Sequence, residues 1–223
     1  MIAVPASDPL QPAAEPALPG DQVRREGALL LARSFAGDAL IEWLLPSAGD
    51  REAARQRLFE CLLGPMGGRL TLTADRQAVA VWFAGGETSS WWAEWCFFRL
   101  LVSHLGGPTA VSRGLGLKRL EKARVSGRHC YLRLLAVAPQ QRRRGLGRAL
   151  VNVVLARARL DGVPVCLETS SQANVGFYRS LGFEVCARTE LTAGLTVWSM
   201  VCSPGPRVLP EPGAALQPPW STT

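Results

Sequence analysis

The sequence predicts an α/β protein with a mixed sheet, and three observations support this prediction. Short apolar strands alternate with amphipathic helices in the second half of the chain, which is typical of a sheet flanked by helices. Apolar residues make up 48% of the 223 residues, which is enough for a sizeable core. The last two apolar stretches, residues 184–190 and 195–202, flank a turn at Thr192–Gly194 and predict a hairpin.

In the first half of the chain, helices outnumber strands. Gly37 and Pro46 each end a helix, and Asp50 is the expected N-cap of the next one. A turn at Asp75–Arg76 separates two strands. The spacing of apolar residues predicts helices over residues 25–35, 39–45, 51–63, 89–105 and 114–125, and strands over residues 69–74 and 77–83.

The second half is more regular. Pro139 ends an apolar strand, and Asp161–Gly162 ends the helix that follows it. Gly182 ends a later helix because glycine accepts the left-handed conformation, and Phe183 is expected to pack back on the last turn. The strands cover residues 129–138 and 163–168, and the helices cover residues 145–160 and 172–181.

The two ends of the chain differ from the middle in composition. Residues 1–20 are rich in proline and alanine, and residues 203–223 contain six prolines. Such segments bury little surface, so we expect one folded domain over residues 21–202 with a flexible tail at each end. Residues 1–20 lack the basic start and apolar stretch of a signal peptide, and no apolar run reaches the roughly 18 residues of a membrane span. We therefore expect a cytoplasmic protein without a membrane partner.

Metal binding is not expected from the cysteine and histidine pattern. The six cysteines are spread singly, without a CxxC pair, and His104 and His129 are the only histidines. The sequence therefore lacks the closely spaced cysteines and histidines that are typical of metal sites. The cysteines are expected to be free thiols in a reducing compartment.

The most informative segment is residues 141–148, with the sequence QRRRGLGR. It follows a predicted strand and opens a predicted helix, so it offers free backbone N–H groups at the positive end of a helix dipole. Its two glycines let a ligand approach the backbone closely. We expect this segment to bind a phosphate or pyrophosphate group, with the arginines adding positive charge.

Of three phosphate-binding patterns, one fits this segment. A dinucleotide-binding G-x-G-x-x-G turn would need glycine at Leu150, and the Gly-Lys-Ser/Thr of a P-loop is absent. The pattern that fits is [Q/R]-x-x-G-x-[G/A], with Arg142, Gly145 and Gly147. It resembles the acetyl-CoA pyrophosphate loop of the GCN5-related N-acetyltransferase (GNAT) superfamily. A second Gly-Leu-Gly at residues 114–116 follows no strand, and we expect no binding there.

The resemblance to the GNAT superfamily extends beyond this loop. Residues 131–139 resemble the family's fourth strand, and residues 166–170 resemble its fifth. His129-x-Tyr131-Leu132, residues 167–170, Asn174-x-x-Phe177-Tyr178 and Val197-Trp198-x-Met200 further resemble puromycin N-acetyltransferase-like proteins. The resemblance is good over residues 129–202 and looser over residues 28–128. It departs in the first strand, for which only Val23 and Arg24 remain, and at Arg143, where many relatives carry glycine.

The resemblance implies the GNAT acyl-CoA N-acyltransferase fold and an acetyl-CoA-dependent N-acetyltransferase. Acetyl-CoA would be the co-substrate, without a metal, and the acceptor would be the primary amine of a small, for instance antibiotic-like, molecule. The pantetheine arm would pair with the backbone of Leu135, Ala136 and Val137, and Asn174 would hydrogen-bond to it. The pyrophosphate would be held by Arg142, Arg143, Arg144, Gly145, Leu146, Gly147 and Arg148.

The same resemblance suggests two catalytic residues. Tyr178 lies one helical turn after Asn174 and would protonate the departing CoA thiolate. A backbone N–H near Ala136 would stabilise the oxyanion. Glu168 is the nearest candidate for the base, although a structural salt bridge at the end of its strand and proton removal by a water chain stay open.

Other functions also stay open. The chain could be a non-catalytic acyl-CoA-binding protein, or a basic module that binds nucleic acid or anions, although its other arginines are dispersed. Trp91, Trp92, Trp95 and Phe98 lie near one helical face and could pack in the core, form a wall for a flat or apolar amine, or contact a membrane surface. The sequence carries no signal for the acceptor's identity or the oligomeric state.

Overall fold

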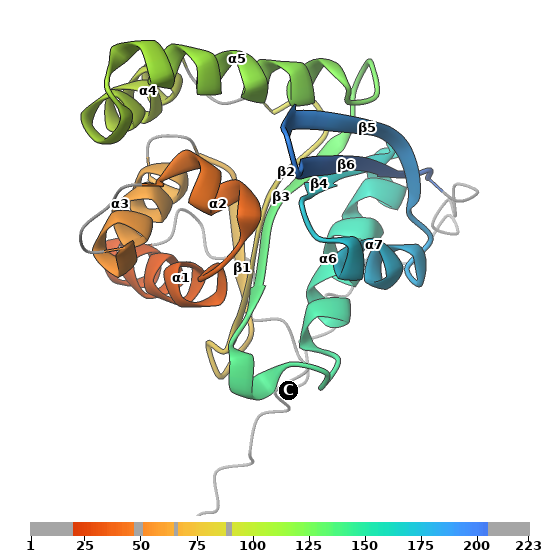
Figure 1. Ribbon diagram of the computed structural model, residues 1–223. Helices are drawn as coiled ribbons and strands as arrows, with labels where there is room; N and C mark the ends of the chain where they lie inside the picture. Colours follow the sequence, from red (N-terminus) through yellow and green to blue (C-terminus); the bar gives the residue numbers. More distant parts are fainter. Residues whose placement is uncertain (1–19, 47–50, 65–66, 88–90, 205–223) are drawn as a thin grey trace, which may run out of the picture.

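The structure is a computed structural model that describes residues 20–46, 51–64, 67–87 and 91–204. A twisted sheet runs through the middle of the molecule, with helices on both faces (Figure 1). The strands are β1 (Arg69–Leu72), β2 (Ala78–Phe83), β3 (Cys130–Val137), β4 (Val165–Thr169), β5 (Glu184–Thr192) and β6 (Leu195–Cys202). The helices are α1 (Asp21–Ser34), α2 (Ala39–Leu44), α3 (Arg51–Leu63), α4 (Trp91–Leu105), α5 (Gly107–Lys122), α6 (Leu146–Asp161) and α7 (Gln172–Arg179).

The predicted mixed sheet is confirmed. Its strand order is β1-β2-β3-β4-β6-β5, and β3 with β4 is the parallel pair. A parallel pair needs a long crossover connection, which α6 supplies. The other described pairs are antiparallel, including the predicted hairpin of β5 and β6.

Two hydrophobic clusters lie on opposite faces of the sheet. The first unites α1, α2 and α3 with side chains of β1 and β2, and the second unites α6 and α7 with the other face. The central strand β2 contributes to both, with Val79 and Val81 in the first cluster and Trp82 in the second. Figure 1 shows α4 and α5 lying across one end of this arrangement.

Most predicted elements are present, with shifts at their ends. Helix α1 begins at Asp21 instead of Arg25, and Val23 therefore lies in a helix. Val23 and Arg24, the residues that could have stood for the first strand of the resembled family, both lie in α1. Helix α5 begins at Gly107 instead of Gly114, because proline is tolerated in a first helical turn. The expected N-cap Asp50 and nearly all of both tails lie outside the described residues.

A β-bulge divides β3 into two parts. Val81 of β2 pairs with Leu134 and Trp82 pairs with Leu132, so Arg133 is an extra residue in β3. The side chain of Leu132 consequently belongs to one hydrophobic cluster and that of Leu134 to the other. Pairing with β4 ends at Leu132, and the rest of β3 diverges from β4. The divergence leaves a gap between the two strands.

The Gly-Leu-Gly at residues 114–116 lies inside α5, as its lack of a preceding strand suggested. A Cβ at Gly116 would lie 2.9 Å from Cη2 of Trp43 in α2, whereas one at Gly114 would meet nothing within 4 Å. Gly116 therefore allows the close approach of α5 and the Trp43 ring.

We expect Gly114→Ala to raise the free energy of unfolding by about 0.5–1 kcal/mol, because alanine favours a helix interior. Gly116→Ala should instead lower it by about 1 kcal/mol, because the new methyl group displaces the Trp43 ring. Urea denaturation followed by circular dichroism measures both values. Equal stabilisation by the two substitutions would show that the contact with Trp43 is unimportant.

Candidate active site

The gap between β3 and β4 exposes one backbone edge of β3. The Ala138 N–H donates to the Gln77 carbonyl beside β2 at 2.8 Å. Strand alternation therefore turns the backbone of Ala136 toward β2 and the backbone groups of Leu135 and Val137 toward the gap. No described strand pairs with this edge. Leu135 and Val137 can therefore pair with an extended ligand as if it were a further strand.

The segment after β3 folds sharply. A short 3₁₀ turn, Pro139–Gln141, precedes Arg143 and Gly145, whose φ angles of 64° and 84° are both left-handed. Gly145 is the N-cap of α6, and no side chain caps this helix end. Leu146 is buried and anchors the turn in the core. The first N–H groups of α6 can thus bind an anion.

Arginine side chains surround this helix end. Arg142 Nη2 donates to the Ser34 carbonyl at 3.3 Å, and Arg148 Nη2 donates to the Ser180 hydroxyl at 3.0 Å. These two bonds connect the segment to α1 and to the end of α7. Arg143 and Arg144 are exposed. The result is a basic rim around a free helix N-terminus.

Gly147 shows how closely the parts of this site approach one another. A Cβ at this position would lie 3.6 Å from Val137 Cγ2, 3.6 Å from Phe177 Cζ and 3.9 Å from Leu135 Cδ2. The first turn of α6, the free edge of β3 and helix α7 therefore meet at one point. A side chain larger than alanine at residue 147 would fill the space where these three elements meet.

Helix α7 places Tyr178 in this part of the core. The ring is 8% exposed and packs edge-on against Phe177 and Phe183, at centroid distances of 5.0 and 5.7 Å. Burial raises the pKa of the Tyr178 phenol, which therefore stays protonated at neutral pH. One turn earlier, the exposed Asn174 donates its side-chain amide to Thr169 Oγ1 at 3.4 Å. Both predicted residues thus lie on the element next to the gap.

Glu168 lies in a network of three side chains. Arg124 Nε donates to Glu168 Oε1 at 2.6 Å, and the Tyr131 hydroxyl donates to Oε2 at 2.6 Å. The Arg124 guanidinium also lies 3.8 Å from the centre of the Tyr131 ring. Glu168 and Tyr131 belong to the sequence motifs described above. Arg124 does not, because it lies in the connection between α5 and β3, where no motif marks it.

The charges in this network stabilise one another. Burial raises the pKa of the Tyr131 phenol and the negative charge of Glu168 raises it further, so Tyr131 stays a donor. Burial acts to lower the pKa of Arg124, but Tyr131 and Glu168 outweigh it and raise that pKa overall. The Glu168 side chain is only 7% exposed. Both oxygens of Glu168 accept hydrogen bonds, and the salt bridge with Arg124 is observed. The role of Glu168 as the catalytic base stays a prediction.

A cavity of about 920 Å³ lies between α2, α4, α5 and this face of the sheet. Tyr131, Arg133 and Glu168 contribute its sheet side. Its volume falls in the range typical of sites for small molecules. Its apolar wall includes Leu40, Ile41, Leu44, Trp95, Phe97, Phe98, Leu101, Leu117 and Leu120.

The aromatic residues of α4 take part in this wall. Trp95 and Phe98 line the cavity and are 44% and 38% exposed, while Trp92 is 52% exposed and stacks on Trp95. These side chains are therefore exposed instead of packed in the core, and two of them line the cavity, while their contact with an amine stays a prediction. The side chain of Trp91 lies outside what the structure describes.

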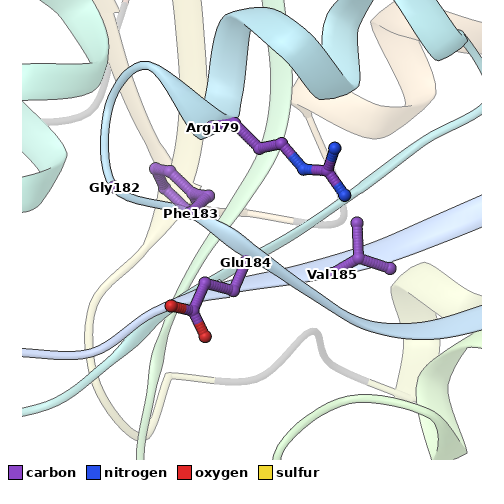
Figure 2. A pocket seen from close by; sticks show the side chains of 5 residues that line it. All are labelled: Arg179, Gly182, Phe183, Glu184 and Val185. Atoms are coloured by element: carbon purple, nitrogen blue, oxygen red, sulfur yellow. The ribbon is translucent and has the colours of Figure 1, made fainter.

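A smaller hollow of about 460 Å³ lies at the turn between α7 and β5 (Figure 2). The side chains of Arg179 and Glu184 extend in different directions there. The hollow therefore lacks the convergence of polar groups found in the larger cavity. Its described lining is Arg179, Gly182, Phe183, Glu184 and Val185.

The described residues contain no group of three or more histidine, cysteine, aspartate or glutamate side chains that could hold a metal ion. All six cysteines are free thiols. No helix in the described part of the chain has the length and apolarity to cross a membrane.

Residues 115–204 match the family model described as an acetyltransferase (GNAT) domain. A histone acetyltransferase and related acetyltransferase from Corynebacterium glutamicum shares 21% identity and a TM-score of 0.61, covering 86% of this chain and 97% of that one. Arylalkylamine N-acetyltransferase 2 from Aedes aegypti shares 12% identity and a TM-score of 0.56, covering 84% and 96%. A polyamine N-acetyltransferase from Drosophila melanogaster shares 19% identity and a TM-score of 0.51, covering 82% and 95%.

The six-stranded mixed sheet, its flanking helices and the gap between β3 and β4 define the α/β fold class of this protein. The chain has the GNAT fold, and residues 115–204 are similar to the acetyltransferase (GNAT) domain.

The Arg124–Glu168–Tyr131 network yields a prediction about stability. Glu168→Ala leaves the Arg124 guanidinium and the Tyr131 hydroxyl buried without Glu168, so we expect the free energy of unfolding to fall by about 3 kcal/mol. Tyr131→Phe removes only one hydrogen bond and should cost about 1 kcal/mol. Guanidinium denaturation of both variants measures the difference. A loss in Glu168→Ala no larger than that in Tyr131→Phe would contradict the role of the network.

Proposed function

We propose that this protein transfers an acetyl group from acetyl-CoA to the primary amine of a small molecule. One observation carries the proposal: the unpaired edge of β3 and the free N-terminus of α6 meet at a single gap, which is bordered by Phe177 of α7, the residue next to the protonated Tyr178. The family match supports the acetyl donor, because acyl-CoA is the co-substrate that a GNAT domain implies.

In the proposed complex, each part of the gap binds a different part of acetyl-CoA. The N–H groups at the start of α6 and the arginines of the rim bind the pyrophosphate. The pantetheine arm pairs with the backbone of Leu135 and Val137, whereas the backbone of Ala136 faces β2 and stays in the sheet. In the proposal Asn174, which is exposed at the start of α7, binds the arm.

Tyr178 is proposed to protonate the sulfur of the departing CoA. Its phenol is protonated at neutral pH because burial raises its pKa, and it follows Phe177, whose ring borders Gly147. While both substrates are bound, the amine loses a proton to Glu168 or to a water chain, and its nitrogen attacks the thioester carbon. The C–N bond forms as the C–S bond breaks, the sulfur takes the proton of Tyr178, and a proton released by the amine restores the phenol through water. Holding both reactants in place supplies much of the acceleration.

The acceptor is proposed to occupy the cavity of about 920 Å³. Two of the similar structures carry names that refer to small amines, an arylalkylamine and a polyamine, and this favours a small-molecule amine here. The narrower resemblance to puromycin N-acetyltransferase-like proteins stays a prediction. A cytoplasmic location is part of the proposal, because six free thiols suit a reducing compartment.

The cofactor site is tested by calorimetric titration with acetyl-CoA. We expect saturable binding by the natural protein and at least tenfold weaker binding by Gly147→Glu, because the side chain fills the meeting point and repels the pyrophosphate. Gly107→Glu is the matched control, since a Cβ at Gly107 meets nothing within 4 Å and α5 begins far from the gap. Absence of acetyl-CoA binding, together with DNA binding that falls steeply with salt, would instead favour the nucleic-acid module.

The acid is tested by Tyr178→Phe. We expect kcat to fall by about 100-fold while the Kd of acetyl-CoA changes less than twofold, because only the proton donor is lost. Because burial raises the pKa of this phenol above its usual value of about 10, kcat of the natural protein should not fall through Tyr178 below pH 10. Amine screening by release of free CoA provides the assay. Binding of acetyl-CoA without turnover of any amine would favour the non-catalytic alternative.

A further inference from the structure

Asp38 is a carboxylate beside the same gap, and no motif in the sequence marks it. It ends the connection between α1 and α2. At the start of this connection the Ser34 hydroxyl donates to the Val137 carbonyl of β3 at 3.4 Å. At its end Asp38 Oδ2 accepts a hydrogen bond from the hydroxyl of Ser170, which directly follows β4, at 3.0 Å. The connection therefore bridges the diverging ends of β3 and β4.

Asp38 is held firmly by neutral donors. Its Oδ1 accepts the backbone N–H groups of Leu40 and Ile41 at 3.0 and 3.1 Å, and Oδ2 accepts from Ser170. Among the described residues no arginine, lysine or histidine forms an ion pair with it. The residue is half-buried and remains reachable. Its negative charge is thus fixed in place without a cationic partner.

Glu168 differs from Asp38 in this respect. The two residues are related through β4, because Glu168 and Ser170 are two positions apart and point to the same face. Glu168 is already paired with Arg124 at 2.6 Å. Glu87, another carboxylate of the cavity lining, pairs with Arg69 at 3.3 Å. Asp38 differs from these two carboxylates because it forms no ion pair with a described arginine, lysine or histidine, so its charge is available to a cationic ligand.

The position of Asp38 relative to the cavity supports this role. Leu40 and Ile41, whose N–H groups it caps, both line the cavity, and so does Glu168. Asp38 itself is not one of the residues that line the cavity, but its carboxylate caps two residues that do, so it lies beside the part of the wall formed by the start of α2. The remaining wall is largely apolar and includes Trp95 and Phe98.

We propose that Asp38 binds the ammonium group of the acceptor, which is an amine on an apolar or aromatic body. The ammonium group is held at the gap by the carboxylate, and the body packs against the aromatic wall of α4. Ser170 is a positioning residue that fixes the Asp38 carboxylate. This inference rests on the proposed function, because it assigns the second substrate of the same site.

The experiment measures acceptor binding without turnover. The probe is 2-phenylethylamine, titrated calorimetrically into the full chain saturated with CoA, which has no acetyl group to transfer. We expect Asp38→Asn to weaken binding at least tenfold, because a charge-assisted hydrogen bond is lost. Asparagine is as good an N-cap as aspartate, so α2 should be retained, and thermal unfolding checks this. Ser170→Ala should weaken binding by a smaller factor.

Two controls separate charge from shape. Glu121→Gln removes an exposed carboxylate of the cavity lining on α5 and should leave binding within twofold. The neutral analogue 2-phenylethanol should bind the natural protein and Asp38→Asn equally weakly. Equal binding of 2-phenylethylamine by the natural protein and Asp38→Asn would overturn the proposal, as would a larger effect of Glu121→Gln.

Failure of this proposal can be distinguished from failure of the proposed function. If acetyl-CoA binds but 2-phenylethylamine does not bind the CoA complex, the acceptor class and the role of Asp38 are wrong while the cofactor site stands. If acetyl-CoA itself does not bind, the acetyltransferase proposal fails.

Discussion

The bulge at Arg133 is the constraint on which the rest of this structure depends. One extra residue in β3 exchanges the faces of the following side chains and ends the pairing with β4. Without it, β3 and β4 could stay paired as far as Leu134 and Thr169, the last residue of β4, and the strands would not diverge beside Leu135 and Val137. The gap, the approach of α6 and the bridging connection at Asp38 all presuppose this divergence.

The bulge also separates two chemically different environments. On one face, α6 and α7 surround the gap with a basic rim and a buried phenol. On the other face, α2, α4 and α5 enclose a largely apolar cavity whose polar floor is the Arg124–Glu168–Tyr131 network. A charged, extended ligand suits the first environment and a compact apolar one suits the second. In the proposed reaction the two would meet where β3 leaves β4.

Sequence predicted the features that depend on local chemistry. The segment at residues 141–148, the helix end at Gly182 and the strand–helix order follow from glycine, proline and apolar spacing, and the structure confirms these elements. The bulge was not predicted, because residues 130–137 form one continuous strand pattern in the sequence and nothing at Arg133 marks an extra residue. Nor did the sequence predict Arg124 beside Glu168 or Asp38 beside Ser170, because those pairs are 44 and 132 residues apart and only the folded topology joins them.

The hydrogen bond from Ser34 to the Val137 carbonyl has a consequence for the order of binding. A pantetheine arm that pairs with this edge of β3 would compete with the Ser34 hydroxyl for the same carbonyl. Ser34 also accepts the hydrogen bond from Arg142 of the basic rim, and it lies four residues before Asp38. Occupation of the first site would thus shift the segment that carries the second. The two substrates would then be thermodynamically linked, each altering the affinity for the other by the same factor.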